Sequence, residues 1–218
     1  MKKLLCMSLA LIILCLSLFA CNEKDARVAP TMDEIDLSEI EDLSKVSVSE
    51  KETDYVKIEI QNFGTVVIRL FPEVAPATVA NFKKLVSKGF YDGLLFHRVI
   101  EGFMIQGGDP KGDGTGNADE KIKGEFTENG FENNLEHVRG VVSMARATEP
   151  DSASCQFFIV QETSAQNHAS LDGKYASFGY VIYGMDIVDE IAGVRTNSKD
   201  KPVAMVKMTS VEFVAVAN

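Results

Sequence analysis

Residues 96–109 combine side-chain types that could do chemistry on a substrate. Arg98 is a permanent cation with several donors in a rigid plane, and Gln106 adds an amide that both donates and accepts hydrogen bonds. Phe103 and Met104 stand between them and could form an apolar surface beside the cation. The alternatives are that Arg98 is a surface ion-pair partner and that the two apolar residues are ordinary core.

The histidines and the cysteine of the globular part argue against metal and nucleophile chemistry. His97, His137 and His168 show no metal-ligand spacing, so no metal is expected. Cys155 lies just before the apolar run 157–160, separated from it by one residue, which favours a small buried thiol over a nucleophile.

The first 21 residues have the pattern of an export signal. A basic head, Lys2 and Lys3, precedes an apolar run over residues 4–20, and Cys21 follows Ala20. The end of this run resembles the lipobox of bacterial lipoproteins, in which the cysteine carries lipid and becomes the mature N-terminus. We therefore predict a signal peptide over 1–20 and lipidation of Cys21. The alternatives are an ordinary cleaved signal and an uncleaved anchor.

Residues 21–54 are predicted to comprise the lipidated cysteine and an acidic tether. Residues 22–54 hold eleven acids and four bases, and Pro30 is their only proline. An extended, self-repelling spacer is favoured, with a short amphipathic helix as the alternative. Residues 55–218 are then a single domain, which must rely on its hydrophobic core because Cys155 has no disulfide partner within it.

The overall composition limits the classes of partner. The chain is 45% hydrophobic and 25% charged, as in an ordinary globular protein, and its formal net charge is −10. An acidic balance argues against nucleic acid and against peripheral binding to anionic lipid. Nothing in the sequence indicates oligomerisation, so a monomer is expected.

The domain contains many short strand patterns and two isolated helix patterns. Val56, Ile58 and Ile60 alternate with polar residues, and residues 62–64 turn the chain into a second β-rich run over 65–70. Further short runs are expected as strands over 95–100, 103–106, 140–145, 156–160, 176–182 and 203–216. Helices are predicted over 76–88 and 185–191. This pattern favours a closed or sandwiched antiparallel sheet.

Three ordered blocks in the domain resemble signatures of the cyclophilins, the cyclosporin-type peptidyl-prolyl isomerases. They are FHRVIEGFMIQGGD at 96–109, SCQFFI at 154–159 and LDGKYASFG at 171–179. The resemblance covers about residues 55–218. It implies a mainly β fold, a closed eight-stranded antiparallel barrel capped by two α-helices.

The resemblance also implies an activity, the cis–trans isomerisation of X–Pro bonds in proline-containing peptides, with no cofactor. Arg98 and Gln106 would be catalytic, with the arginine directed at the prolyl nitrogen. Substrate would be bound by Phe103, Met104, Ala145, Arg146, Ala147, Gln156, Phe158, Leu171 and Tyr175. Since isomerisation transfers no proton, a structural hydrogen-bonding role for His97 is preferred over that of a general base.

Three positions depart from the best-known members of the family. Arg146 replaces an asparagine, and Tyr175 replaces a histidine at the pocket rim. Ser170 stands where a tryptophan, or often a histidine in bacterial members, contacts cyclosporin, so only weak binding of that drug is expected.

The prediction is therefore a lipid-anchored, extracytoplasmic isomerase that assists the folding of unfolded exported proteins at the cell membrane. One alternative is a cyclophilin-like chaperone module that binds peptides with little turnover, which turnover of a proline tetrapeptide would distinguish. A second is a solute-binding lipoprotein, although such proteins usually have larger α/β lobes around a cleft.

Overall fold

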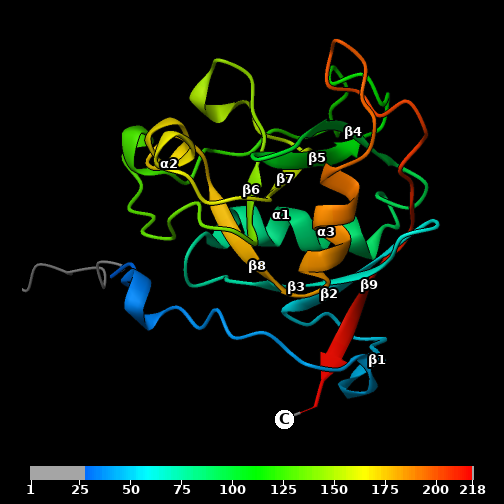
Figure 1. The fold of residues 1–218 in the computed structure, drawn as a ribbon. Helices are drawn as coiled ribbons and strands as arrows, with labels where there is room; N and C mark the ends of the chain where they lie inside the picture. The colour runs from blue at the N-terminus through cyan, green and yellow to red at the C-terminus, as the bar shows by residue number, and fades with distance from the viewer. Residues whose placement is uncertain (1–27, 218) are drawn as a thin grey trace, which may run out of the picture.

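The computed structural model describes residues 28–217 (Figure 1). The predicted signal peptide and Cys21 lie outside these residues. Within residues 28–217, no helix is both long enough and apolar enough to cross a bilayer.

The described residues form a mainly β structure with short helices. The strands are β1 (Val46–Val48), β2 (Tyr55–Ile60), β3 (Gly64–Leu70), β4 (Leu95–Ile100), β5 (Met104–Asp109), β6 (Val141–Met144), β7 (Phe157–Val160), β8 (Ser177–Tyr183) and β9 (Met208–Val216). The α-helices are α1 (Pro76–Ser87), α2 (Ala165–Leu171) and α3 (Met185–Ala192). Four 3₁₀ turns are η1 (Met32–Glu34), η2 (Leu43–Lys45), η3 (Thr127–Asn129) and η4 (Pro150–Ser152).

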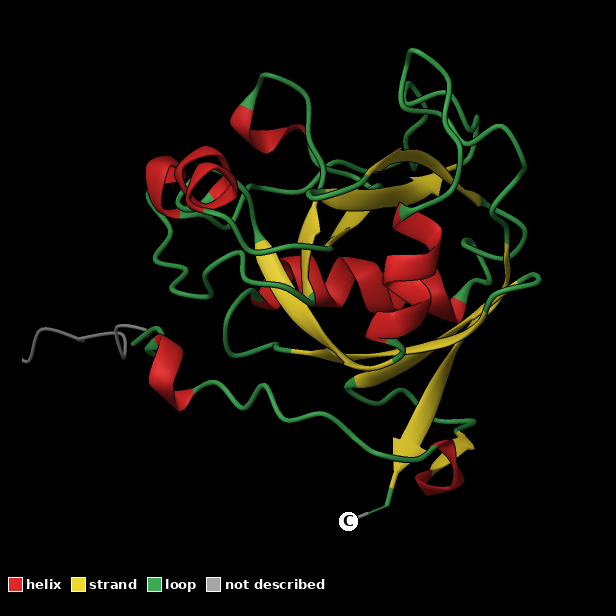
Figure 2. Cartoon of the chain, viewed as in Figure 1, coloured by secondary structure: helices red, strands yellow, loops and turns green. Residues whose placement is uncertain are grey.

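The nine strands make one antiparallel sheet in the order β1-β9-β2-β3-β8-β6-β7-β5-β4. Seen from the direction of Figure 2, the curved strands frame helices α1 and α3. Among the described residues no ladder closes this sheet, and only an isolated bridge between Leu95 and Lys207 joins β4 to the chain just before β9. The prediction of a closed eight-stranded barrel is therefore wrong in both strand count and closure, although the mainly β class is confirmed.

The first hairpin and the first helix follow their sequence patterns. In β2, alternate residues are buried, which confirms the strand predicted from Val56, Ile58 and Ile60, and β2 pairs with β3 as expected. Helix α1 begins at Pro76, where a missing N–H has no cost. The buried Glu125 caps it from outside, because its carboxylate accepts hydrogen bonds from the backbone N–H groups of the second and third helical residues, at 3.0 and 2.8 Å.

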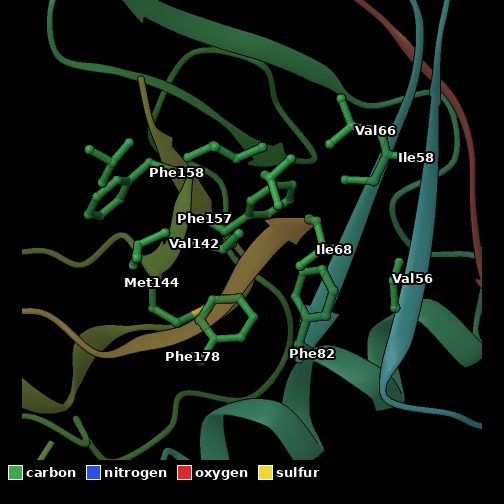
Figure 3. Close-up of a cluster of buried hydrophobic side chains, with 14 of the residues drawn as sticks. Val56, Ile58, Val66, Ile68, Phe82, Val142, Met144, Phe157, Phe158 and Phe178 are labelled. Carbon is green, nitrogen blue, oxygen red and sulfur yellow. The ribbon is translucent and has the colours of Figure 1, made fainter. Parts of the chain in front are cut away.

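One aromatic cluster joins α1 to the sheet (Figure 3). The ring of Phe82 lies 5.2 Å from that of Phe178 on β8 and 5.5 Å from that of Phe157 on β7. On β7, Phe157 and Phe158 point to opposite sides of the strand in Figure 3, as the pleat requires. Phe157 thus belongs to the core, and Phe158 faces the cavity described below.

Two helix predictions are confirmed and one helix was missed. Helices α1 and α3 match the patterns predicted over 76–88 and 185–191. The prediction of two α-helices omitted α2, which has only seven residues. Its sequence includes asparagine and serine, which are weak helix formers, so no helical periodicity stands out.

The described part of the predicted tether lies against the domain instead of extending away from it. It runs along the outside of the strands in Figure 1 (blue) and includes β1, which pairs with β9. Ile40 donates a backbone hydrogen bond to the carbonyl of Ile182 at 2.7 Å, and Asp36 forms an ion pair with Arg69. Together with Leu43, Ile40 covers a small apolar patch on the outer face of the sheet. The boundary predicted at residue 54 itself stays a prediction.

Candidate active site

A cavity of about 720 Å³ opens beside β4 and β5, and it contains most of the predicted site residues. Nine of the eleven catalytic and substrate-binding residues predicted for the domain line it: Arg98, Phe103, Met104, Gln106, Ala145, Arg146, Phe158, Leu171 and Tyr175. The other two, Ala147 and Gln156, line a smaller adjoining groove of about 260 Å³ that shares Gln106, Ala145 and Arg146 with the cavity.

Sheet register builds the centre of this cavity. Arg98 on β4 is paired with Gln106 on β5, Gln106 with Phe158 on β7, and Phe158 with Ser143 on β6. Directly opposed residues in a sheet point to the same face, so these four side chains form one row across four strands. A bulge between Phe96 and Arg98 shifts the register at the edge strand, a common way to redirect a side chain beside a site.

The floor of the cavity consists of apolar side chains that expose little of their surface to solvent. Met104, Phe158 and Leu171 are 2%, 4% and 4% exposed, whereas Phe103 at its border is only half-buried. Tyr175 packs edge-on against Phe158, with ring centroids 5.9 Å apart. These side chains form a pocket with the chemistry to take an apolar ring.

A buried polar chain supports the floor from behind. The imidazole of His137 stacks on Phe158, its Nδ1 lies 2.7 Å from Oδ1 of Asp172, and its Nε2 lies 2.9 Å from Oγ of Ser143. The order of groups is that of a hydrolytic triad, but Ser143 and His137 are 0% and 1% exposed. Because substrate cannot reach the hydroxyl, this chain fixes the Phe158 ring and performs no nucleophilic step.

Arg98 is half-buried at the cavity wall and has a carboxylate partner. Its Nε lies 3.5 Å from Oδ2 of Asp200, and the backbone N–H of Val99 donates to the carbonyl of Asp200 at 2.8 Å. Asp200 has a φ of 59°, a left-handed conformation that is uncommon outside glycine. The ion pair restrains the guanidinium on its Nε side and leaves its terminal nitrogens for other partners.

The polar wall is a pair of glutamines. Nε2 of Gln106 donates to Oε1 of Gln156 at 2.9 Å, and Nε2 of Gln156 donates to the carbonyls of Gly116 and Gly114 at 2.8 and 3.1 Å. The loop carbonyls thus fix Gln156, and Gln156 fixes Gln106 opposite Arg98.

His97 is buried behind the same loop. Both of its ring nitrogens lack a hydrogen-bond partner among the described residues, so the structural hydrogen bond predicted for it is not seen. Burial lowers the pKa of His97, while the nearby carboxylate of Asp109 opposes that shift. Burial by itself would raise the pKa of Asp109. Hydrogen bonds from the backbone N–H groups of Lys111, Gly114 and Asp113 outweigh this effect and hold the pKa below its usual range. Asp109 therefore stays ionised and shapes the loop.

The loop after α3 contributes residues that sequence reasoning missed. Asn197, Lys199 and Lys201 line the cavity, and Asp113 enters from the opposite loop. No local pattern marks them, because they reach the site only through tertiary folding. Ser170 also lines the cavity, exposed on α2, as expected for a rim position.

The chain's sequence and structure match known proteins across this site. Residues 55–213 match the family described as cyclophilin type peptidyl-prolyl cis-trans isomerase/CLD. A peptidyl-prolyl cis-trans isomerase of Acinetobacter baylyi is 42% identical over 160 residues, covering 71% of this chain and 83% of that protein. A peptidyl-prolyl cis-trans isomerase of Schizosaccharomyces pombe, ppi1, is 39% identical over 153 residues, which cover 69% of this chain and 94% of that protein. A crystal structure of a Cryptosporidium parvum cyclophilin type isomerase, in the presence of the dipeptide Ala-Pro, is similar to this chain with a TM-score of 0.65 and 30% sequence identity. The match covers 75% of this chain and 99% of that chain.

Proposed function

The chain belongs to the cyclophilin-type family of peptidyl-prolyl cis–trans isomerases, and from this premise we propose how its cavity works and where it acts. The activity is isomerisation of X–Pro peptide bonds. The observation that carries the mechanism is the row that places Arg98 and Gln106 beside Phe158 in one cavity.

The physical task is to weaken amide resonance for a moment. Rotation about a peptide bond faces a barrier of about 18–20 kcal/mol, because the nitrogen lone pair is shared with the carbonyl. X–Pro bonds have similar cis and trans energies yet interconvert slowly. A group that stabilises only the twisted amide lowers this barrier without covalent chemistry.

Arg98 supplies that group. When the bond twists, the prolyl nitrogen becomes pyramidal and its lone pair becomes a hydrogen-bond acceptor. A terminal N–H of Arg98 donates to this lone pair and stabilises the twisted state more than the planar one. Asp200 restrains the other side of the guanidinium, and Gln106 lies beside Arg98 on the paired strand.

The floor and the edge segment hold the two halves of the substrate. Phe103, Met104, Phe158 and Leu171 hold the proline ring, with Tyr175 closing its rim. The backbone of residues 145–147, with Gln156 beside it, anchors the chain flanking the proline. Rotation then moves one half of the substrate against a fixed ring. The Ala-Pro dipeptide with the Cryptosporidium relative supports proline-containing peptides as the ligand class.

We further propose that the substrates are unfolded exported proteins and that the enzyme is a monomer held outside the cytoplasm by lipid on Cys21. Support comes from the basic head, the apolar run and the Ala20-Cys21 junction in the sequence. Acylation adds about 0.8 kcal/mol of membrane affinity per buried methylene.

Metabolic labelling with radioactive palmitate in a bacterial host tests this location. The wild-type chain should be labelled and should sediment with membranes, while Cys21→Ala should lose the label. The matched control is Cys15→Ala, which alters a cysteine inside the predicted signal and should keep it. A wild-type chain that is unlabelled and absent from the membrane fraction would contradict the anchor while leaving the isomerase activity untouched.

A further inference from the structure

Arg146 is fixed on the wall between the cavity and the adjoining groove. Its guanidinium carbon lies 5.0 Å from the ring centroid of Phe126 and 4.8 Å from that of Tyr175. Contact with the two rings restrains the cation on the wall and favours it through the quadrupoles of the rings. The side chain is thus held in place before any ligand arrives.

The hydrogen bonds of Arg146 use only part of its donor capacity. Nε donates to the carbonyl of Lys174 at 2.9 Å, and Nη1 donates to the carbonyls of Ala147 and Thr148 at 3.0 and 3.1 Å. An arginine has five N–H donors, and within residues 28–217 the two on Nη2 have no hydrogen-bond partner. A rigid guanidinium with one unused edge can receive a carboxylate at little entropic cost.

The surroundings of this edge are basic, although the protein is acidic. The whole chain carries 32 acidic and 22 basic residues, with a net charge of −10. The charged residues that line the cavity and the groove are nevertheless five bases and one acid: Arg98, Lys121, Arg146, Lys199, Lys201 and Asp113. Asp200 lies nearby but is paired with Arg98. Clefts lined by one sign of charge concentrate ligands of the opposite sign.

We propose that Arg146 is a specificity-determining residue that selects X–Pro segments with a glutamate or aspartate close to the proline. The carboxylate binds the Nη2 edge of Arg146 while the proline ring occupies the floor and Arg98 acts on the prolyl nitrogen. This inference rests on the proposed function and names the substrate class of the same site.

Matched peptides test the selectivity of the full-length chain. NMR exchange spectroscopy would give kcat/KM for pairs of proline peptides that differ only by Glu or Gln at a single position. The varied positions are the two before the proline and the two after it, taken one at a time. At one position at least, the Glu peptide should be isomerised about three- to fivefold faster than its Gln partner at low salt, as for a partly exposed ion pair. The ratio should approach one in about 0.5 M salt, where exposed charges are screened.

Two variants assign the effect to Arg146. Arg146→Gln should remove most of the Glu-to-Gln preference and leave only the smaller contribution of the other bases in the lining. Lys51→Gln removes the same charge at an exposed position after β1, outside the cavity lining, and should keep the wild-type ratio. Equal rates for Glu and Gln peptides with the wild type, or a preference that Arg146→Gln leaves undiminished, would overturn the inference. Absence of turnover on every peptide would instead contradict the isomerase function.

Discussion

The floor and the rim of the cavity are held in place by different interactions. The floor consists of Met104, Phe158 and Leu171, which are buried and packed with the core of the sheet. At the rim, the cations Arg98 and Arg146 are held by an ion pair and by ring contacts. In the proposed mechanism, the floor therefore serves folding and binding together, whereas the rim serves the reaction and its selectivity and is expected to add little to stability.

The largest effect is expected from breaking the floor. Phe158→Ala should reduce the free energy of unfolding by about 3–5 kcal/mol, because it removes a buried ring and leaves a cavity. It should also raise KM, since in the proposed mechanism the proline ring loses an apolar contact on the floor. Denaturant unfolding and steady-state isomerisation, measured on one preparation, check both. Unchanged stability would show that the floor is separable from the core and would remove the contrast with the rim.

Cyclosporin affinity tests the rim at α2. Ser170→Trp should tighten drug binding about a hundredfold, because an indole adds roughly 2 kcal/mol of apolar contact and about 1 kcal/mol from a hydrogen bond. Isomerisation should change far less, since the floor is unaltered. The new tryptophan, the only one in the chain, also reports binding by fluorescence. Tight inhibition of the wild type would show that Ser170 does not limit the affinity.

A smaller, pH-dependent effect is expected from His97. Burial lowers the pKa of this histidine in the folded chain from its ordinary value of 6.5. Between the folded pKa and 6.5 the unfolded chain binds more protons, so the free energy of unfolding is intact above pH 6.5 and falls as the pH drops below it. Urea unfolding from pH 7.5 to 5.5 should show this decline for the wild type and a flatter profile for His97→Gln. Identical profiles would remove His97 as the cause.

Local patterns in the sequence predicted the first hairpin, α1 and α3, because periodicity and Pro76 are local signals. The family resemblance indicated eleven residues for the site, and nine of them line one cavity. The closed barrel was implied by the family resemblance and is wrong for this chain. The strand patterns left a closed or a sandwiched sheet open, because pairing between distant strands leaves no mark in a short window of sequence.

The same limit applies to the supports of the site. The pairing of Phe158 with Ser143 places the Phe158 ring beside the polar chain of Ser143 and His137. It joins two strands whose register no local pattern encodes. Asp200 approaches Arg98 from a loop about a hundred residues later in the chain. The contact of Arg146 with Phe126 likewise depends on tertiary folding, so the sequence showed the unusual arginine but not its restraint.

The most direct test of the account is the isomerisation rate of Arg98→Ala, measured by NMR exchange on a proline peptide, with unfolding measured on the same sample. Arg98 is half-buried at the rim, so the free energy of unfolding should stay within about 0.5 kcal/mol of the wild type. Loss of a donor directed at the transition state should lower kcat/KM by about 10²–10³. Near wild-type turnover in this well-folded variant would contradict the central claim that Arg98 lowers the rotational barrier.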